Sequence, residues 1–171
     1  MKAEKIKIGF DLDGVIIGKP FFIPVELMEV LVRDKKKRGL SYRFPESRLE
    51  IAIRILSHDP FFRPPIQKNI KLIKELYKSK NYEIFVVSSR YSFLLNRTKQ
   101  WFRYYKLHKF FKEIHINLEN QQPHIFKEKM INNLKLNVFI DDDKMLLEYL
   151  KKRLHGVDLL YVSDNNFQVR R

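Results

Sequence analysis

The chain has 171 residues, of which 44% are hydrophobic and 32% are charged, and it contains no cysteine. This composition excludes a disordered or fibrous chain, and the lack of cysteine excludes disulfides and thiolate chemistry. The 34 lysines and arginines outnumber the 20 aspartates and glutamates, and the resulting net charge of +14 favours anionic partners without choosing among phosphorylated molecules, nucleic acid and an anionic membrane surface.

The N-terminal sequence has no apolar stretch of signal-peptide length, and no apolar run reaches the roughly 18 residues that a membrane span requires. We therefore expect a soluble, cytoplasmic protein with no membrane span. A chain of this length accommodates one α/β domain with a modest insertion, but not two full domains.

Five short apolar runs predict strands at about 6–12, 83–88, 113–116, 137–140 and 158–162. Between them, apolar residues recur every three or four positions, which predicts helices at about 66–77, 93–105, 126–134 and 146–154. Strands that alternate with helices predict an α/β fold in which a mainly parallel central sheet is flanked by helices on both faces.

A long stretch after the first strand interrupts this alternation. Six prolines punctuate it, and it contains two expected short helices, at about 24–34 and 46–57, separated by the basic run 35–38. We interpret residues 17–63 as a small helical cap inserted beside the carboxyl end of the first strand. Residues 1–16 and 64–171 would form the core.

Two aspartates, Asp11 and Asp13, follow the first apolar strand and are separated by one residue. In a regular strand both side chains would lie on the same face, at the strand end where open α/β sheets bind ligands. Carboxylates so close repel each other unless a cation or a shared proton intervenes, and oxygen ligands suit Mg²⁺. Gly14 would let the backbone turn sharply and approach a ligand.

A second motif, Ser88-Ser89-Arg90, follows the next apolar run. Hydroxyl and free backbone N–H groups at the start of a following helix can donate to a phosphate oxygen. An ordinary helix N-cap is the alternative interpretation, because serine is a preferred capping residue.

A third motif, Asp141-Asp142-Asp143, follows the predicted strand at 137–140. We expect Asp143 to cap the next helix. In the preceding helix, Lys127 or Lys129 could reach these acids, steady a nucleophile and neutralise a phosphoryl group, although a solvated surface position is the alternative for each.

In order along the chain, the segments GFDLDGV, FVVSSR, Lys127 and VFIDD resemble the four motifs of the haloacid dehalogenase superfamily. The resemblance covers about residues 5–16 and 64–164. It implies a Rossmann-like core with a cap and Mg²⁺-dependent phosphatase activity. The short insertion is most similar to the caps of small nucleotidase-like members.

The resemblance also implies roles for individual residues. Asp11 would attack phosphorus and form an aspartyl-phosphate, and Asp13 would protonate the leaving oxygen, later activate water and offer its backbone carbonyl to the metal. Lys127 matches the family lysine better than Lys129 does. The remaining assignments are Ser88 in catalysis, Gly14, Ser89 and Arg90 in phosphate or substrate binding, and Asp11, Asp13, Asp141 and Asp142 at the metal.

Three functions remain open from the sequence. The first is hydrolysis of a small phosphorylated molecule such as a nucleotide or a sugar phosphate. The second is removal of phosphate from a nucleic-acid end, motivated by the net charge and by the aromatic and basic run 101–106, which is more simply an amphipathic helix. The third is a non-catalytic binding module. Cationic contacts to a substrate could come from the cap residues Lys19, Arg43, Arg48, Arg54, His58 and Arg63.

Overall fold

A computed structural model describes residues 4–18, 40–45 and 47–163 and the backbone of residues 166–169. Within these residues, six strands form one sheet in the order β3-β2-β1-β4-β5-β6. Their bounds are β1 Ile6–Phe10, β2 Tyr82–Tyr91, β3 Glu113–Asn117, β4 Val138–Asp141, β5 Asp158–Ser163 and β6 Asn166–Val169. The first five strands are parallel, and β6 pairs with β5 in the antiparallel direction.

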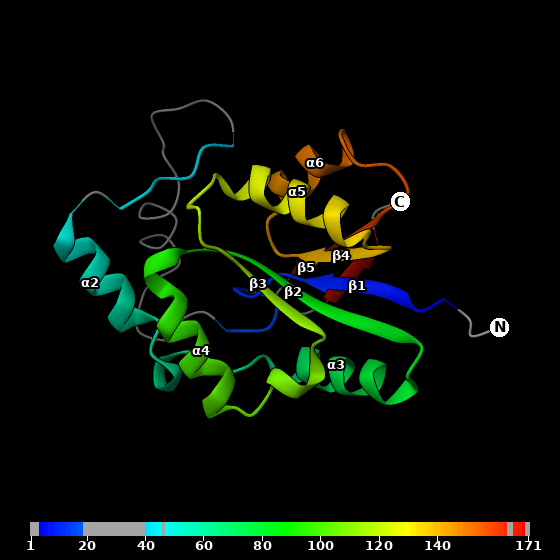
Figure 1. Ribbon diagram of the computed structural model, residues 1–171, viewed down its shortest axis with the longest axis horizontal. Coiled ribbons are helices and arrows are strands. Elements are labelled where there is room, and N and C mark those ends of the chain that lie inside the picture. The colour runs from blue at the N-terminus through cyan, green and yellow to red at the C-terminus, as the bar shows by residue number, and fades with distance from the viewer. Residues whose placement is uncertain (1–3, 19–39, 46, 164–165, 170–171) are drawn as a thin grey trace.

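Helices cover both faces of this sheet (Figure 1). They are α2 Arg48–Ser57, α3 Gln67–Ser79, α4 Leu95–Tyr104, α5 Pro123–Leu134 and α6 Lys144–Lys151. Helices α3 and α4 lie on one face, and α5 and α6 lie on the other. The predicted α/β fold with a parallel sheet between helical layers is therefore confirmed. Within the described part of the chain, no helix is long and apolar enough to cross a membrane.

Strand β2 shows how the two cores form. Its side chains alternate between the faces, so that Ile84 and Val86 join the core under α3 and α4, whereas Phe85 and Val87 join the core under α5 and α6. A strand buried on both faces needs apolar residues at nearly every position. This requirement explains why the strand sequences lack an alternating polar pattern.

The structure corrects one expectation at the end of a strand and adds one strand. Strand β2 continues through Ser88-Ser89-Arg90 to Tyr91, with a shift in its register against β3, so these residues do not start a helix. Helix α4 follows a 3₁₀ turn at Ser92–Leu94. In this last part of the strand Arg90 is buried, and Asp13 and Thr98 are its charged and polar partners inside the protein. Strand β6 was not predicted at all.

The expected helix at 46–57 is present as α2, whose N-cap Ser47 accepts a hydrogen bond from the Glu50 N–H at 3.1 Å. It lies beyond the carboxyl ends of the strands, where it contacts the Ser92–Leu94 turn (Figure 1). The other expected cap helix, at 24–34, lies outside the described residues. The division into a 17–63 cap and a core remains a prediction.

Candidate active site

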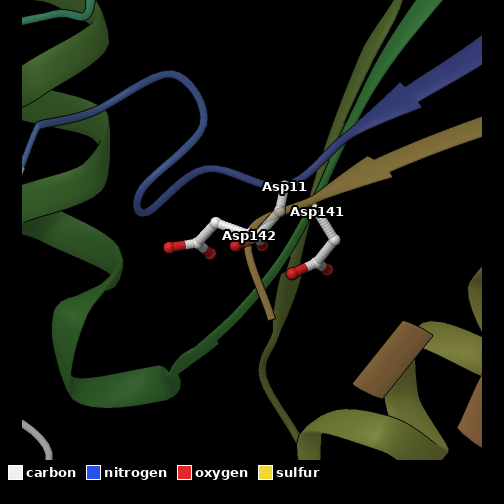
Figure 2. Close-up of side chains that lie close together, drawn as sticks. All are labelled: Asp11, Asp141 and Asp142. Atoms are coloured by element: carbon white, nitrogen blue, oxygen red, sulfur yellow. The ribbon is translucent and has the colours of Figure 1, made fainter. Parts of the chain in front are cut away.

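Three carboxylates meet at the carboxyl ends of β1 and β4, which are neighbours in the sheet. Asp11 directly follows β1, and its N–H continues the strand pairing by donating to the Ile140 carbonyl at 2.8 Å. Asp141 ends β4, and Asp142 follows it. One oxygen from each of Asp11, Asp141 and Asp142 lies within 4.8 Å of the others. Figure 2 shows these three side chains close together.

A lysine from α5 lies between two of these acids. The Lys127 ammonium group is 2.9 Å from Asp11 Oδ1 and donates a hydrogen bond of 2.7 Å to Asp141 Oδ2. All three side chains are buried, with exposed fractions of 9% or less. Lys129, in contrast, is half exposed and has Glu119 at 3.9 Å. The structure thus places Lys127, and not Lys129, beside the acids.

Lys127 does not fully offset the cost of burying the negative charges of Asp11 and Asp141, because the pKa values of both acids remain raised. Burial raises the pKa of Asp11 to about 7 despite the opposing effect of Lys127, and Asp141 adds to the rise. Burial also raises the pKa of Asp141. The acids raise the pKa of Lys127 against its own burial, so it stays protonated. A divalent cation with oxygen ligands fits this donor set, because it would offset the remaining repulsion.

Gly14 makes room for Asp142. Its backbone has a φ of +79°, in the left-handed region that favours glycine, and a Cβ atom built there would lie 1.9 Å from Asp142 Oδ2. The sequence predicted a sharp turn and a close approach at Gly14. The structure shows that the group approached is the carboxylate of Asp142.

Hydrogen bonds to α3 and its preceding segment hold the turn that carries Asp13 and Gly14. The Asn69 side chain donates to the Val15 carbonyl at 2.7 Å, and the Gly18 N–H donates to the Pro64 carbonyl at 2.8 Å. The apolar side chains in this turn, Leu12, Val15, Ile16 and Ile17, are fully buried. The turn is therefore fixed by packing as well as by backbone pairing.

The carboxylate of Asp13 takes a different set of partners. Arg90 donates to it from Nε at 2.6 Å and from Nη2 at 2.7 Å, and Arg63 Nη1 lies 2.9 Å from its Oδ1. Burial disfavours the charged form of Asp13, but Arg90 and Arg63 outweigh that effect and hold its pKa well below the usual range. Sequence reasoning assigned both arginines to substrate contacts and missed their pairing with Asp13.

Residues of helix α4 form hydrogen bonds with both arginines. Arg90 Nη1 donates to Thr98 Oγ1 at 3.0 Å on α4. The backbone carbonyl of Arg63 accepts a 2.7 Å hydrogen bond from the Trp101 indole. Because α4 fixes both residues, the position of the Asp13 carboxylate depends on a helix that carries none of the acids.

The two predicted serines occupy different environments. Ser88 is buried, and its Oγ accepts a hydrogen bond of 3.3 Å from the Arg90 N–H. Ser89 lines a cavity of about 200 Å³ that also includes Asp13 and Arg90. Four of the six cap residues predicted to supply cationic contacts lie in its wall, namely Arg43, Arg54, His58 and Arg63, but burial and the nearby arginines lower the pKa of His58 and keep it neutral. Of the other two cap cations, Arg48 is exposed and Lys19 lies outside the described residues.

Asp143 caps α6, as predicted, by accepting hydrogen bonds from the N–H groups of Met145 and Leu146 at 3.0 and 3.2 Å. Its own N–H donates to Asp141 Oδ1 at 2.9 Å, and its second oxygen accepts a hydrogen bond from the Tyr42 hydroxyl. The cap thereby orients Asp141. Tyr42 was missed because no local pattern connects it to a residue so distant in the sequence.

Neither a protein-family model nor a curated protein matches the sequence. Solved structures do match the fold. A haloacid dehalogenase-like hydrolase from Streptococcus pneumoniae is 15% identical, with a TM-score of 0.57 over 93% of this chain and 85% of the other. A haloacid dehalogenase-like hydrolase from Bacteroides fragilis is 13% identical, with a TM-score of 0.61 over 91% of this chain and 86% of the other.

A third similar structure is a haloacid dehalogenase family enzyme from Bacteroides thetaiotaomicron in complex with magnesium and inorganic phosphate. It is 13% identical, with a TM-score of 0.57 over 95% of this chain and 96% of the other. At such low identity the likeness establishes the fold. The chain has the Rossmann-like α/β fold of haloacid dehalogenase-like hydrolases.

Proposed function

We propose that this protein is a Mg²⁺-dependent phosphomonoesterase of the haloacid dehalogenase type, in which Asp11 attacks phosphorus and forms an aspartyl-phosphate. The observation that carries the proposal is the placement of Lys127 between Asp11 and Asp141, at 2.9 and 2.7 Å. Phosphoryl transfer needs a nucleophile, positive charge near the phosphoryl oxygens and ligands for a metal ion. Asp11, the Lys127 ammonium group and the acids Asp141 and Asp142 could supply these at one edge of the sheet.

Lys127 serves both the free protein and the reaction. In the free protein it compensates the buried charge of Asp11 and keeps that oxygen oriented. When a phosphoryl group approaches, the same ammonium group lies where negative charge develops on the transferred oxygens. Preorganised charge of this kind is a large contributor to enzymatic rate enhancement, because it costs no reorganisation during the reaction.

Asp11, Asp141 and Asp142 would hold Mg²⁺, and the backbone carbonyl of Asp13 would complete the protein ligands. When bound, the ion would supply positive charge that neutralises phosphoryl oxygens and favours the ionised, nucleophilic form of Asp11. The fit rests on three mutually close carboxylates, two of them buried with raised pKa values.

Asp13 would act on the leaving group and on water. In the described arrangement its carboxylate is ionised and held by Arg90 and Arg63, which lower its pKa and make it a weak base. To protonate a leaving oxygen in the first step, Asp13 must first gain a proton. Both roles, donating a proton to the leaving oxygen and accepting one from the attacking water, therefore require that the pairing with the two arginines loosen while substrate is bound.

Ser88, Ser89, Arg90 and Gly14 would complete the binding of the phosphorylated substrate. Ser89 lies at the wall of the cavity that contains Asp13. We assign Ser88 to the phosphoryl oxygens, although its hydroxyl currently accepts from the backbone of Arg90. A small helical cap at 17–63, similar to those of nucleotidase-like enzymes, would cover a small phosphorylated metabolite such as a nucleotide or a sugar phosphate.

The structure weakens one argument for a nucleic-acid substrate. The aromatic and basic run 101–106 was the candidate surface for stacking bases, but the side chains of Trp101 and Phe102 are buried in the core beneath α4. Rings buried in this way are not available for stacking on bases. The net charge of +14 and the ring of Tyr104, which is 62% exposed, still favour this alternative.

The test is a phosphate-release screen of phosphomonoesters with wild-type protein, with and without Mg²⁺. We expect turnover that requires Mg²⁺, is lost with a chelator and falls by on the order of 10³ or more in Asp11→Asn. Asp158→Asn, which changes an exposed aspartate on β5, serves as the matched control and should retain full activity. Folded wild-type protein that releases no phosphate from any monoester would refute the proposal.

A further inference from the structure

We propose that the leaving group of the substrate carries a second anionic group, a phosphate or a carboxylate, which binds the arginines in the wall of the cavity beside Asp13. This inference rests on the proposed phosphatase function and names its substrate class. It is motivated by the arginines in the cavity wall and by the position of the cavity beside Asp13. The proposed catalytic chemistry does not itself require so many arginines there.

The cavity lies where the leaving group would go. Asp13, proposed to act on the leaving oxygen, is part of its wall, and so are Ser89 and Arg90. If Asp13 acts on the leaving oxygen, that oxygen must lie beside the Asp13 carboxylate while phosphorus is bound at Asp11, and because Asp13 is part of the cavity wall, the remainder of the molecule would extend into this space. The volume of about 200 Å³ suits a small molecule better than a polymer.

Four guanidinium groups line this cavity, from Arg43, Arg54, Arg63 and Arg90. Among the described residues, Asp13 and Glu50 each form ion pairs with two of them. Asp13 lies between Arg63 and Arg90, with contacts of 2.9 and 2.6 Å.

The second shared carboxylate is Glu50, which lies 3.1 Å from Arg43 and 2.9 Å from Arg54. Asp142 also acts electrostatically on Arg63, but it belongs to the carboxylate cluster proposed to hold Mg²⁺. Four guanidinium groups around one cavity make this wall a cationic surface, which a bound anion would complement.

The burial of these arginine side chains strengthens their attraction for an anion. The side chain of Arg54 is 14% exposed and that of Arg63 is 3% exposed, whereas Arg43 at 41% stands at the rim. A guanidinium group shielded from water attracts an anion more strongly than one on the open surface, where ion pairs contribute little. Arginine also offers the paired donors that match carboxylate and phosphate oxygens.

The other wall residues fit the carbon skeleton of such a leaving group. Tyr42, Tyr91, Leu94 and Pro123 provide apolar surface. His58 adds no charge, because burial and the nearby Arg90 and Arg63 lower its pKa well below the usual value. Its Nδ1 lies 2.7 Å from the Arg54 carbonyl, which ties the histidine to the end of α2. The cavity thus combines an apolar surface with a cationic wall.

The test compares phenyl phosphate with two analogues of similar size that carry a second anion, 4-carboxyphenyl phosphate and 1,4-phenylene bisphosphate. Calorimetry with Asp11→Asn in the presence of Mg²⁺ measures their binding without turnover. We expect both analogues to bind about tenfold more tightly than phenyl phosphate at low ionic strength, and the difference to shrink as salt is added. The two analogues also distinguish a preference for phosphate from one for carboxylate.

One variant that removes a positive charge and one that removes a negative charge separate the recognition of an anion from effects on folding. In the Asp11→Asn background, Arg54→Met should remove most of the preference for a second anion, and Glu50→Gln should increase it because two arginines lose a shared partner. Arg153→Met, which removes an exposed arginine paired with Glu128, is the matched control and should leave the preference unchanged. A preference that both cavity variants reduce, or that Arg153→Met reduces equally, would overturn the inference.

The outcomes also separate this inference from the proposed function. Turnover of all three compounds by wild type, with equal affinities for them in Asp11→Asn, would overturn the inference and leave the phosphatase function standing. Preferential binding without turnover by wild type would support the anionic site and contradict the phosphatase function. Failure of every probe to bind, or tighter binding of a 5′-phosphorylated oligonucleotide than of both analogues, would overturn the small dianionic substrate.

Discussion

Arg90 donates two hydrogen bonds to the carboxylate of Asp13, from Nε to Oδ2 at 2.6 Å and from Nη2 to Oδ1 at 2.7 Å. Two parallel contacts fix the plane of the carboxylate as well as its distance, which a single ammonium group cannot do. Arg90 comes from β2 and Asp13 from the turn after β1, so this pair couples the second motif of the sequence to the first.

Arg90→Lys should therefore impair the reaction through the position of Asp13. We expect kcat to fall by about 10² for an alkyl phosphate, whose poor leaving group needs a proton, and by less for 4-nitrophenyl phosphate. Steady-state kinetics on the two substrates measure this ratio, and Asp13→Asn should show the same pattern. Arg103→Lys, at an exposed position on α4, is the control. Equal losses on both substrates would argue against the assigned role of Asp13.

Lys127→Met should cost stability as well as activity. Removal of the buried ammonium group leaves Asp11 and Asp141 without their cation, and such losses amount to about 3 kcal/mol or more in the free energy of unfolding. Urea denaturation without Mg²⁺ measures the effect, which Mg²⁺ should partly reverse. Lys129→Met, in the same helix but half exposed, should change neither stability nor turnover. Similar losses in the two variants would contradict the assignment.

The binding of Mg²⁺ should depend on pH through Asp11. Its pKa is raised from 3.8 to about 7, so below about pH 7 the metal must displace a proton from the folded protein. We expect the affinity for Mg²⁺ to rise by up to about tenfold per pH unit toward pH 7 and then to level off. Calorimetric titrations across this range provide the measurement, and Asp11→Asn should flatten the profile.

The same shift predicts how the metal-free protein responds to pH. The Asp11 carboxyl binds its proton more tightly in the folded protein than in the unfolded chain. This difference stabilises the folded state fully below about pH 4, and the stabilisation is lost as the pH rises through about 7. The difference in Tm between wild type and Asp11→Asn should therefore change in favour of the variant over this range. A difference that stays constant with pH would show that Asp11 titrates normally.

Gly14→Ala should weaken Mg²⁺ binding by displacing Asp142. Its Cβ atom would overlap Asp142 Oδ2, and the residue would also carry the strain of a positive φ. Gly156→Ala separates the two effects, because Gly156 has a φ of +75° but nothing within 4 Å of an added Cβ atom. Both variants should lose about 1 kcal/mol of stability or more. Only Gly14→Ala should lower the affinity for Mg²⁺, as measured by calorimetry, and an equal change in both variants would refute the contact.

The sequence predicted what local patterns encode. Apolar runs located the five parallel strands, and the acids that follow β1 and β4 indicated correctly that Asp11 and Asp141 would meet, because the carboxyl ends of parallel strands share one edge of the sheet. The cap at Asp143 was also predictable, since it depends on the residues that immediately follow it.

Contacts between distant segments could not be predicted in this way. Arg63 and Arg90 are far from Asp13 in the sequence, and only the folded chain brings their guanidinium groups to its carboxylate. The polar residues at the end of β2 suggested a helix start, because nothing local shows that Thr98 and Asp13 would satisfy a buried arginine. Strand β6 was missed because its pairing with β5 depends on a partner strand and not on its own short sequence.

The most direct test of the central claim is a crystal structure with Mg²⁺ and fluoroberyllate, a mimic of an aspartyl-phosphate. We predict beryllium bonded to a carboxylate oxygen of Asp11, a fluoride within hydrogen-bond reach of the Lys127 ammonium group, and Mg²⁺ ligated by Asp11 and Asp141. Fluoroberyllate bound to another residue, or Mg²⁺ bound away from these two acids, would contradict the account.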